Sequence, residues 1–186
     1  MENHVCPVWV GYFLASPLRK LAHDPEKILG PYIAPGMSVI DYGCAMGYFS
    51  IPMAKMVGDK GRVYCFDIQE RMLMKLEKRA KRAGVEHIVQ PVLINSNGNT
   101  EGGNKSFADF ALLFAVVHEV PDTQLLFTNL STMMKTGSTV LIAEPKGHVG
   151  IDDFAKTTMI AENAGFERMK SLNINSSHAT LFKKSE

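Results

Sequence analysis

Residues 38–53 read S-V-I-D-Y-G-C-A-M-G-Y-F-S-I-P-M, and the fold of the chain can be predicted outward from them. A short β-branched run ends at Asp41, a turn containing Gly43 and Gly47 follows, and an apolar-periodic segment comes next. Glycine lets a backbone bend sharply and approach a ligand closely. A helix that opens after such a turn directs free N–H groups at a bound molecule. The stretch therefore predicts a strand, a turn and a helix that form a nucleotide site.

The glycine spacing indicates which kind of nucleotide. A dinucleotide fingerprint that starts at Gly43 needs glycines at positions 45 and 48, where the chain has Ala45 and Tyr48. The pattern present, D-x-G-x-A-x-G, resembles the first motif, D/E-x-G-x-G-x-G, of class I (Rossmann-like) S-adenosylmethionine (SAM)-dependent methyltransferases of the small single-domain type. Ala45 replaces the middle glycine, which leaves open whether the methyl group tightens the turn or weakens cofactor binding.

The resemblance implies SAM as cofactor and S-adenosylhomocysteine as product. Residues 43–47 would cradle the methionine part of SAM, with Asp41 near its amino group. The full set of residues that the resemblance places at the cofactor is Asp41, Gly43, Cys44, Ala45, Gly47, Phe49, Asp67, Ile68, Asn95 and Ala115.

The next expected strand, residues 62–67, ends in another acid. Asp67 lies 24 positions after Gly43 (67 − 43), near the distance at which a ribose-binding carboxylate follows the turn of a βαβ unit. Ile68 would then contact the adenine. The alternative is that Asp67 only caps the following helix, which has its apolar residues on one face and mixed charge elsewhere.

A third strand is expected at residues 88–94, with Pro91 at an edge position. Members of the family often have an acid after this strand, where it accepts from the adenine amino group. This chain has Asn95, Ser96 and Asn97, and an amide oxygen can accept the same bond without a charge. Which of the three residues does so is left open.

Residues 109–117 form a continuous apolar run, as expected for a central parallel strand buried on both faces. The run places His118 and Glu119 at the carboxyl end of the strand, where open α/β sheets bind ligands. Small members of the methyltransferase family often have a His-Glu pair at this place.

The remaining pattern predicts a helix at 125–134, a strand that ends near Glu144, a helix at 151–163 and a hairpin of 167–174 and 178–183. Together with the resemblance, it predicts an α/β fold with a doubly wound, seven-stranded, mostly parallel sheet. The last strand runs antiparallel and helices cover both faces. We expect one domain over residues 1–186, in which residues 1–35 form a helical or lid segment.

Methyl transfer from a sulfonium is an in-line displacement, so the enzyme mainly positions the nucleophile and excludes water. A base is needed when the nucleophile carries a proton near pH 7. The candidates for catalysis at the carboxyl edge of the expected sheet are His118, Glu119, Glu144 and His148, and His178 in the last hairpin is a further one. The alternatives are that His118 is a structural histidine and that Glu119 caps the next helix.

Composition narrows the classes of partner. The chain has 186 residues with a formal net charge of +1, which gives no reason to expect nucleic-acid binding. Its apolar runs are too short for a membrane span, and its N-terminus lacks the pattern of a signal peptide. Three scattered cysteines without metal-ligand spacing favour a reduced, cytoplasmic protein without a metal site. A small molecule is the expected substrate, and the oligomeric state is left open.

Two other functions remain as alternatives. An NAD-dependent oxidoreductase would share the strand, turn, helix and following acid, but it does not match the glycine spacing or the final hairpin. A non-catalytic protein of the SAM-binding fold would keep the domain without turnover, and Ala45 and the missing acid after the third strand are compatible with it.

Overall fold

The computed structural model describes residues 23–95 and 106–185, so the expected lid segment lies largely outside the described residues, as do Ser96 and Asn97. The described residues fall into two compact units that divide after Leu93. The elements of the first unit are α2 (Pro25–Leu29), β1 (Ser38–Tyr42), α3 (Ser50–Val57), β2 (Arg62–Asp67), α4 (Glu70–Ala83) and β3 (Val89–Leu93).

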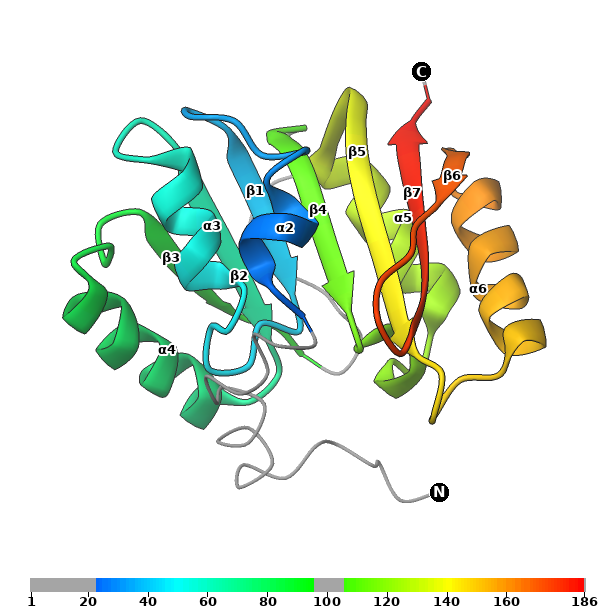
Figure 1. Ribbon diagram of the computed structural model, residues 1–186, viewed down its shortest axis with the longest axis horizontal. Helices are drawn as coiled ribbons and strands as arrows, with labels where there is room; N and C mark the ends of the chain where they lie inside the picture. Colours follow the sequence, from blue (N-terminus) through cyan, green and yellow to red (C-terminus); the bar gives the residue numbers. More distant parts are fainter. Residues whose placement is uncertain (1–22, 96–105, 186) are drawn as a thin grey trace. The chain divides into compact units, whose positions relative to one another are not determined.

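The three strands of the first unit are parallel and follow the order β3-β2-β1 (Figure 1). Their register pairs Asp41 with Cys65 and Asp67 with Leu93, so the carboxyl ends of β1 and β2 are neighbours. In this unit β3 is an outer strand, which suits Pro91 because proline has no N–H to donate. The strands agree with the sequence prediction to within one residue at each end.

The helices of the first unit follow the apolar pattern. The apolar pattern of α4 predicts that Met72, Leu73, Leu76 and Ala80 share one face, and these four are its buried residues. Gly84 ends the helix with a left-handed φ of 70°. The sequence predicts a helix from Pro25 to about Tyr32. The observed helix, α2, starts after Asp24, whose side chain accepts from the N–H of Glu26 at 3.1 Å, and ends at Leu29. The next helix is expected to start at Tyr48, but α3 starts at Ser50, because the left-handed Gly47 extends the turn before it.

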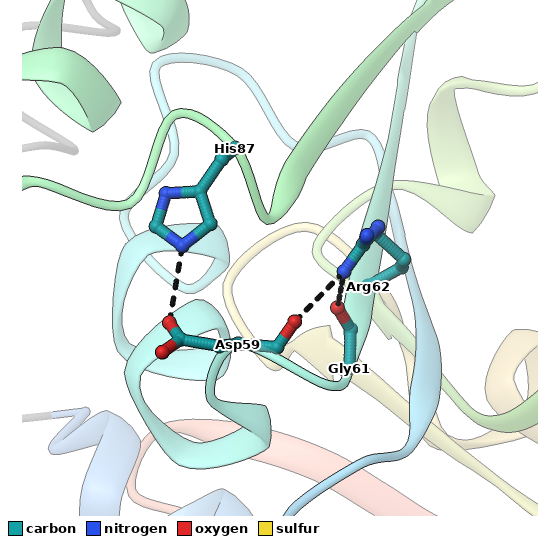
Figure 2. A network of polar contacts seen from close by, with 4 residues as sticks. All are labelled: Asp59, Gly61, Arg62 and His87. Carbon is teal, nitrogen blue, oxygen red and sulfur yellow. Dashed lines mark hydrogen bonds and ion pairs between the residues drawn. The ribbon is translucent and has the colours of Figure 1, made fainter.

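A polar network lies at the amino-terminal end of β2, opposite to the end that carries Asp67 (Figure 2). Nη1 of Arg62 donates to the carbonyls of Asp59 and Gly61 at 3.1 and 2.6 Å, and Nε2 of His87 lies 3.1 Å from Oδ1 of Asp59. These contacts join the turn before β2 to the segment before β3. Because the network is exposed, it contributes little to stability and serves to hold two loops together.

The second unit contains β4 (Ala108–Phe114), the 3₁₀ turn η2 (Val117–Glu119), α5 (Thr123–Met133), β5 (Met134–Pro145), α6 (Ile151–Asn163), β6 (Phe166–Ser171) and β7 (Ser177–Lys184). Its strand order is β4-β5-β7-β6 (Figure 1). Strands β4 and β5 are parallel, whereas β7 is antiparallel to both β5 and β6. The predicted antiparallel last strand is confirmed, and the described residues of the two units supply the seven strands expected.

Strand β4 is shorter than predicted. It ends at Phe114, and Ala115 then adopts a left-handed φ of 55° that turns the chain out of the strand. His118 and Glu119 therefore lie in η2, not directly at the end of the strand. The suggestion that Glu119 caps the next helix is wrong, because Oδ1 of Asp122 accepts from the N–H of Leu125 and caps α5.

The apolar run of β4 is buried as predicted, and large side chains of the other elements complete the core of the second unit. The largest buried members include Phe110, Leu112, Leu126, Phe127, Phe166 and Phe182. No helix within residues 23–95 or 106–185 is long and apolar enough to cross a membrane.

Candidate functional site

The turn between β1 and α3 has left-handed backbone at every second position. Gly43, Ala45 and Gly47 have φ values of 73°, 46° and 78°. A Cβ on Gly47 would lie 2.2 Å from Cδ1 of Leu76, so helix packing also requires glycine there. Ala45 carries a Cβ in a conformation that costs an L-residue about 1–2 kcal/mol. Such local strain is typical of functional sites, where surrounding contacts maintain it.

Most N–H groups of the turn are already paired within the protein. Those of Gly43 and Cys44 both donate to the carbonyl of Phe66, at 2.9 and 3.1 Å. The N–H of Ala45 donates to Oδ2 of Asp67 at 2.9 Å. A diphosphate site needs unpaired N–H groups that converge on the anion. The turn therefore does not have the donor arrangement that a dinucleotide requires.

Asp67 joins the turn to the end of β2. Its side chain is 7% exposed, and its second oxygen, Oδ1, accepts from the N–H of Gln69 at 2.8 Å. Burial raises the pKa of Asp67, and hydrogen bonds from the N–H groups of Gln69, Ala45 and Ile68 oppose that rise. Gln69, and not Asp67, is the N-cap of α4. Because Asp67 also accepts from the N–H of Ala45, helix capping alone does not account for it. Its role at a ribose stays a prediction.

Asp41 lies at the end of β1 and is almost fully buried. Its Oδ2 accepts from Oγ of Ser50, the first residue of α3. Residues 38–53 contain no lysine or arginine, so the charge that this stretch carries is negative. That charge suits the ammonium and sulfonium groups of SAM and opposes a diphosphate. The residues present therefore fit SAM in their charge, with a carboxylate at each of two neighbouring strand ends.

The other predicted cofactor residues of the first unit lie in or beside this turn. Cys44 and Phe49 are each 5% exposed, whereas the side chain of Ile68 is 44% exposed directly after Asp67. Burial, with the neighbouring Cys65, raises the pKa of the Cys44 thiol well above its usual value. Cys44 is therefore a packing residue rather than a nucleophile.

Arg79 is a contact of the turn that the sequence did not reveal. Its Nη1 donates to the carbonyl of Met46 at 2.7 Å from the partly buried face of α4. Burial lowers the pKa of the guanidinium, which stays charged. Six basic residues lie on α4, so composition alone does not single out Arg79. The available signal is its position between the core residues Leu76 and Ala80.

The second unit contains a histidine held by a buried glutamate. Glu144, near the end of β5, is 1% exposed, and its Oε1 accepts from the N–H groups of Val116 and Val117 at 3.0 and 2.9 Å. Its Oε2 is hydrogen-bonded to Nδ1 of His118. A carboxylate only accepts, so Nδ1 carries the proton and Nε2 of His118 is the ring nitrogen left to accept one.

Several groups act on His118. The hydrogen bond to Glu144 raises its pKa most strongly, the charges of Glu144 and Glu119 act in the same direction, and burial opposes them. The ring of His148, in the loop after β5, lies 5.9 Å from the His118 ring at an angle of 31°. His118, Glu144 and His148 thus lie in contact in the second unit, and their role in catalysis stays a prediction.

His178 and the remaining cofactor positions lie elsewhere in the second unit. His178 pairs with Glu144 across β5 and β7 and stacks on Phe154 of α6 at 5.5 Å, which indicates a packing role. Ala115 is left-handed, and its N–H donates to the carbonyl of Ala143 at 2.7 Å. Asn95 is exposed. Among the described residues, no group of three His, Cys, Asp or Glu is arranged to hold a metal ion.

A family model described as a methyltransferase domain matches residues 33–175. The chain belongs to this family. The methyltransferase domain is 24% identical over 126 residues to a demethylmenaquinone methyltransferase of Anoxybacillus flavithermus, a match that covers 68% of the chain and 52% of the relative. It is 28% identical over 137 residues to a ubiquinone biosynthesis O-methyltransferase of Sinorhizobium fredii, covering 74% of the chain and 51% of the relative. The chain thus spans about half the length of these curated relatives.

Solved structures show the same fold. A SAM-dependent methyltransferase from Aquifex aeolicus superposes with a TM-score of 0.85 at 22% identity, covering 96% of this chain and 98% of the other. A structure from Methanococcus maripaludis, described as an S-adenosyl-L-methionine-dependent methyltransferase, gives a TM-score of 0.78 at 14% identity over 100% and 98% of the two chains. The predicted family, the fold class and SAM as cofactor of this methyltransferase domain are confirmed.

Proposed function

We propose that this chain transfers a methyl group from SAM to a small-molecule acceptor whose reacting atom gives up a proton. The observation that carries the proposal is the pairing of His118 with Glu144 at the ends of β4 and β5 in a methyltransferase domain. A histidine whose Nδ1 is occupied by a buried carboxylate presents Nε2 as a proton acceptor. Bound SAM supplies the electrophilic methyl group.

The residues of the chain divide between holding the cofactor and handling the acceptor. In the proposal, Asp41 accepts from the amino group of SAM, residues 43–47 hold its methionine part, and Asp67 accepts from the ribose hydroxyls. The remaining contacts with the cofactor, those with its adenine included, come from Phe49, Ile68, Asn95 and Ala115. Cys44 and Ala45 shape the turn.

His118 is proposed as the base. The proton of the acceptor moves to Nε2 of His118 as the new bond to carbon forms and the carbon–sulfur bond breaks, with its electron pair left on sulfur. Glu144 orients the imidazole and stabilises the charge that it gains. Glu119 acts through its negative charge, which raises the pKa of His118.

Demethylmenaquinone and ubiquinone methyltransferases are among the relatives of the chain, which favours a hydroxylated aromatic ring as acceptor. We propose a single domain over residues 1–186, since the family match spans both units. A small-molecule substrate without nucleic-acid or membrane partners, and a cytoplasmic location, are proposed from the near-neutral charge and the scattered cysteines.

Thermal melting with SAM, S-adenosylhomocysteine and NAD tests the cofactor part. A ligand at about a hundred times its Kd stabilises the protein by roughly 2.7 kcal/mol. We expect SAM and S-adenosylhomocysteine to raise the melting temperature and NAD to leave it unchanged. A shift with NAD alone, or with none of the three, contradicts the proposal.

Transfer of radiolabelled methyl from SAM to 3,4-dihydroxybenzoate and to other catechols tests the catalytic part. We expect turnover that falls by about a hundredfold or more in His118→Ala, the usual contribution of a general base. His87→Ala is the matched control, because His87 also contacts a carboxylate but lies in the exposed network of Figure 2. Equal turnover in the wild type and His118→Ala would show that His118 is not the base.

A further inference from the structure

Arg79 makes a contact to the cofactor turn that the methyl-transfer proposal does not use. Residues 43–47 are braced from two elements of the first unit. From β2, the carbonyl of Phe66 and the carboxylate of Asp67 accept N–H groups of the turn. From α4, Arg79 donates to a carbonyl of the turn, that of Met46.

The hydrogen bond from Arg79 to the carbonyl of Met46 is short and has a charged donor. It measures 2.7 Å from Nη1 to oxygen, and its donor is charged, which makes such bonds about twice as strong as neutral ones. Met46 is 3% exposed, so little water is available to replace the guanidinium at its carbonyl. A buried carbonyl that loses its partner costs free energy comparable to the desolvation of the group. Among the described residues, no carboxylate forms an ion pair with Arg79, so its charge acts on this carbonyl without competition from an acid.

The backbone of the turn explains why it needs this brace. Ala45 and Gly47, on either side of Met46, both have a left-handed backbone, which is an unfavourable conformation for alanine. Cδ1 of Leu76 occupies the space where a Cβ of Gly47 would lie, so one turn of α4 contacts two successive residues of the loop. Leu76 and Arg79 are three positions apart and share one side of the helix.

We propose that Arg79 is a positioning residue of the cofactor site, which fixes the shape of residues 45–47 and thereby sets the affinity for the amino-acid part of the cofactor. The inference rests on the proposed function, because it assumes that this turn holds the methionine half of SAM. Asp67, which holds the ribose in the proposal, is bonded to the N–H groups of Ala45 and Gln69, whereas Arg79 is bonded to the carbonyl of Met46. Loss of the guanidinium therefore weakens ligands that carry the amino-acid tail and leaves shorter ligands unaffected.

The experiment compares Arg79→Gln, Arg79→Lys and Arg82→Gln with the wild type. Arg82 is the matched control, since it is also an arginine, lies three positions later on the same helix, and is exposed. Calorimetry gives the Kd of S-adenosylhomocysteine and of 5′-methylthioadenosine, which keeps the adenosine and the sulfur but lacks the amino-acid part. Hydrogen exchange measures the amides of residues 43–47 without ligand.

We expect Arg79→Gln to raise the Kd of S-adenosylhomocysteine about tenfold while the Kd of 5′-methylthioadenosine changes less than twofold. Exchange at residues 45–47 becomes faster, Arg79→Lys recovers most of the affinity, and Arg82→Gln matches the wild type. The inference is overturned if Arg79→Gln binds S-adenosylhomocysteine as the wild type does, if both ligands weaken equally, or if exchange in the turn is unchanged. Should Arg79→Gln not fold, the same selective loss in Arg79→Lys, smaller in size, decides the matter. A wild type that binds neither ligand contradicts the proposed function instead, and the exchange result still tests the contact.

Discussion

The backbone N–H of Ala45 donates to Oδ2 of Asp67 over 2.9 Å, although the two residues are 22 positions apart in the chain. The bond joins the residue that departs from the methyltransferase motif to the acid that the motif predicts at the ribose. It explains how an alanine is kept at a left-handed φ of 46°, since the acceptor is a buried charged group. Changes at Asp67 should therefore act on both the turn and the cofactor.

Asp67→Ala removes a carboxylate that is proposed to accept from the ribose. We expect the affinity for S-adenosylhomocysteine to fall by about 1–3 kcal/mol, the usual value of a hydrogen bond to a charged group. Calorimetry measures the change, and Asp59→Ala serves as control because Asp59 is exposed at the other end of β2. An unchanged affinity in Asp67→Ala would refute the ribose role.

The pH dependence of cofactor binding should report the same residue. Because burial raises the pKa of Asp67, this carboxyl takes up a proton at a higher pH than an ordinary aspartate. Its contribution to stability is present at low pH and is lost as the pH rises through the raised pKa. The affinity for S-adenosylhomocysteine depends on pH in the opposite direction. It should fall as the pH is lowered through that pKa, since the protonated acid is a poorer acceptor. Calorimetry in buffers of decreasing pH checks the direction, and a constant affinity would count against it.

Gly47→Ala should destabilise the protein more than Gly36→Ala. Both glycines are left-handed, with φ values of 78° and 86°, so both variants lose about 1 kcal/mol or more to backbone strain. The new Cβ meets Leu76 at position 47 and open space at position 36, and overpacking adds about 1–3 kcal/mol. Urea unfolding gives both values. Equal losses would mean that Leu76 moves aside without cost.

Glu144→Gln should lower the pKa of His118. The hydrogen bond to Glu144 is the largest cause of the raised pKa, and an amide neither carries the charge nor prefers the protonated ring. In the wild type this interaction stabilises the fold below the ordinary histidine pKa of about 6.5 and is lost as the pH rises through the raised value. Titration of the imidazole protons by NMR measures the pKa directly. The signal of His87 is an internal control that should not move, and an unmoved His118 signal contradicts the assignment.

The pH profile of turnover follows from the same contact. A base must be neutral to accept a proton, so activity should fall on the acid side of the His118 pKa. In Glu144→Gln the acid limb should move to lower pH, with a lower maximum rate because the ring is less well oriented. A profile identical to that of the wild type would separate His118 from the chemistry.

Most elements of this fold could be predicted because local patterns determine them. The apolar face of α4, its end at Gly84, the bounds of α6 and the strand 62–67 follow from periodicity and from glycine. The prediction was wrong where a single backbone angle decided the outcome. Strand β4 stops at Phe114 because Ala115 is left-handed, and no residue pattern in the apolar run 109–117 indicates that angle.

The sequence by itself determined the family, the order of strands and helices, and the two acids at the ends of β1 and β2, because spacing along one strand–turn–helix unit is local. The tertiary structure alone decided the partners of those residues. Glu144 reaches His118 across 26 positions, and Arg79 reaches Met46 across 33, in each case because folding brings separate elements together. A hydrogen bond between residues far apart in the chain depends on a distance of about 3 Å, which no pattern of residue types records.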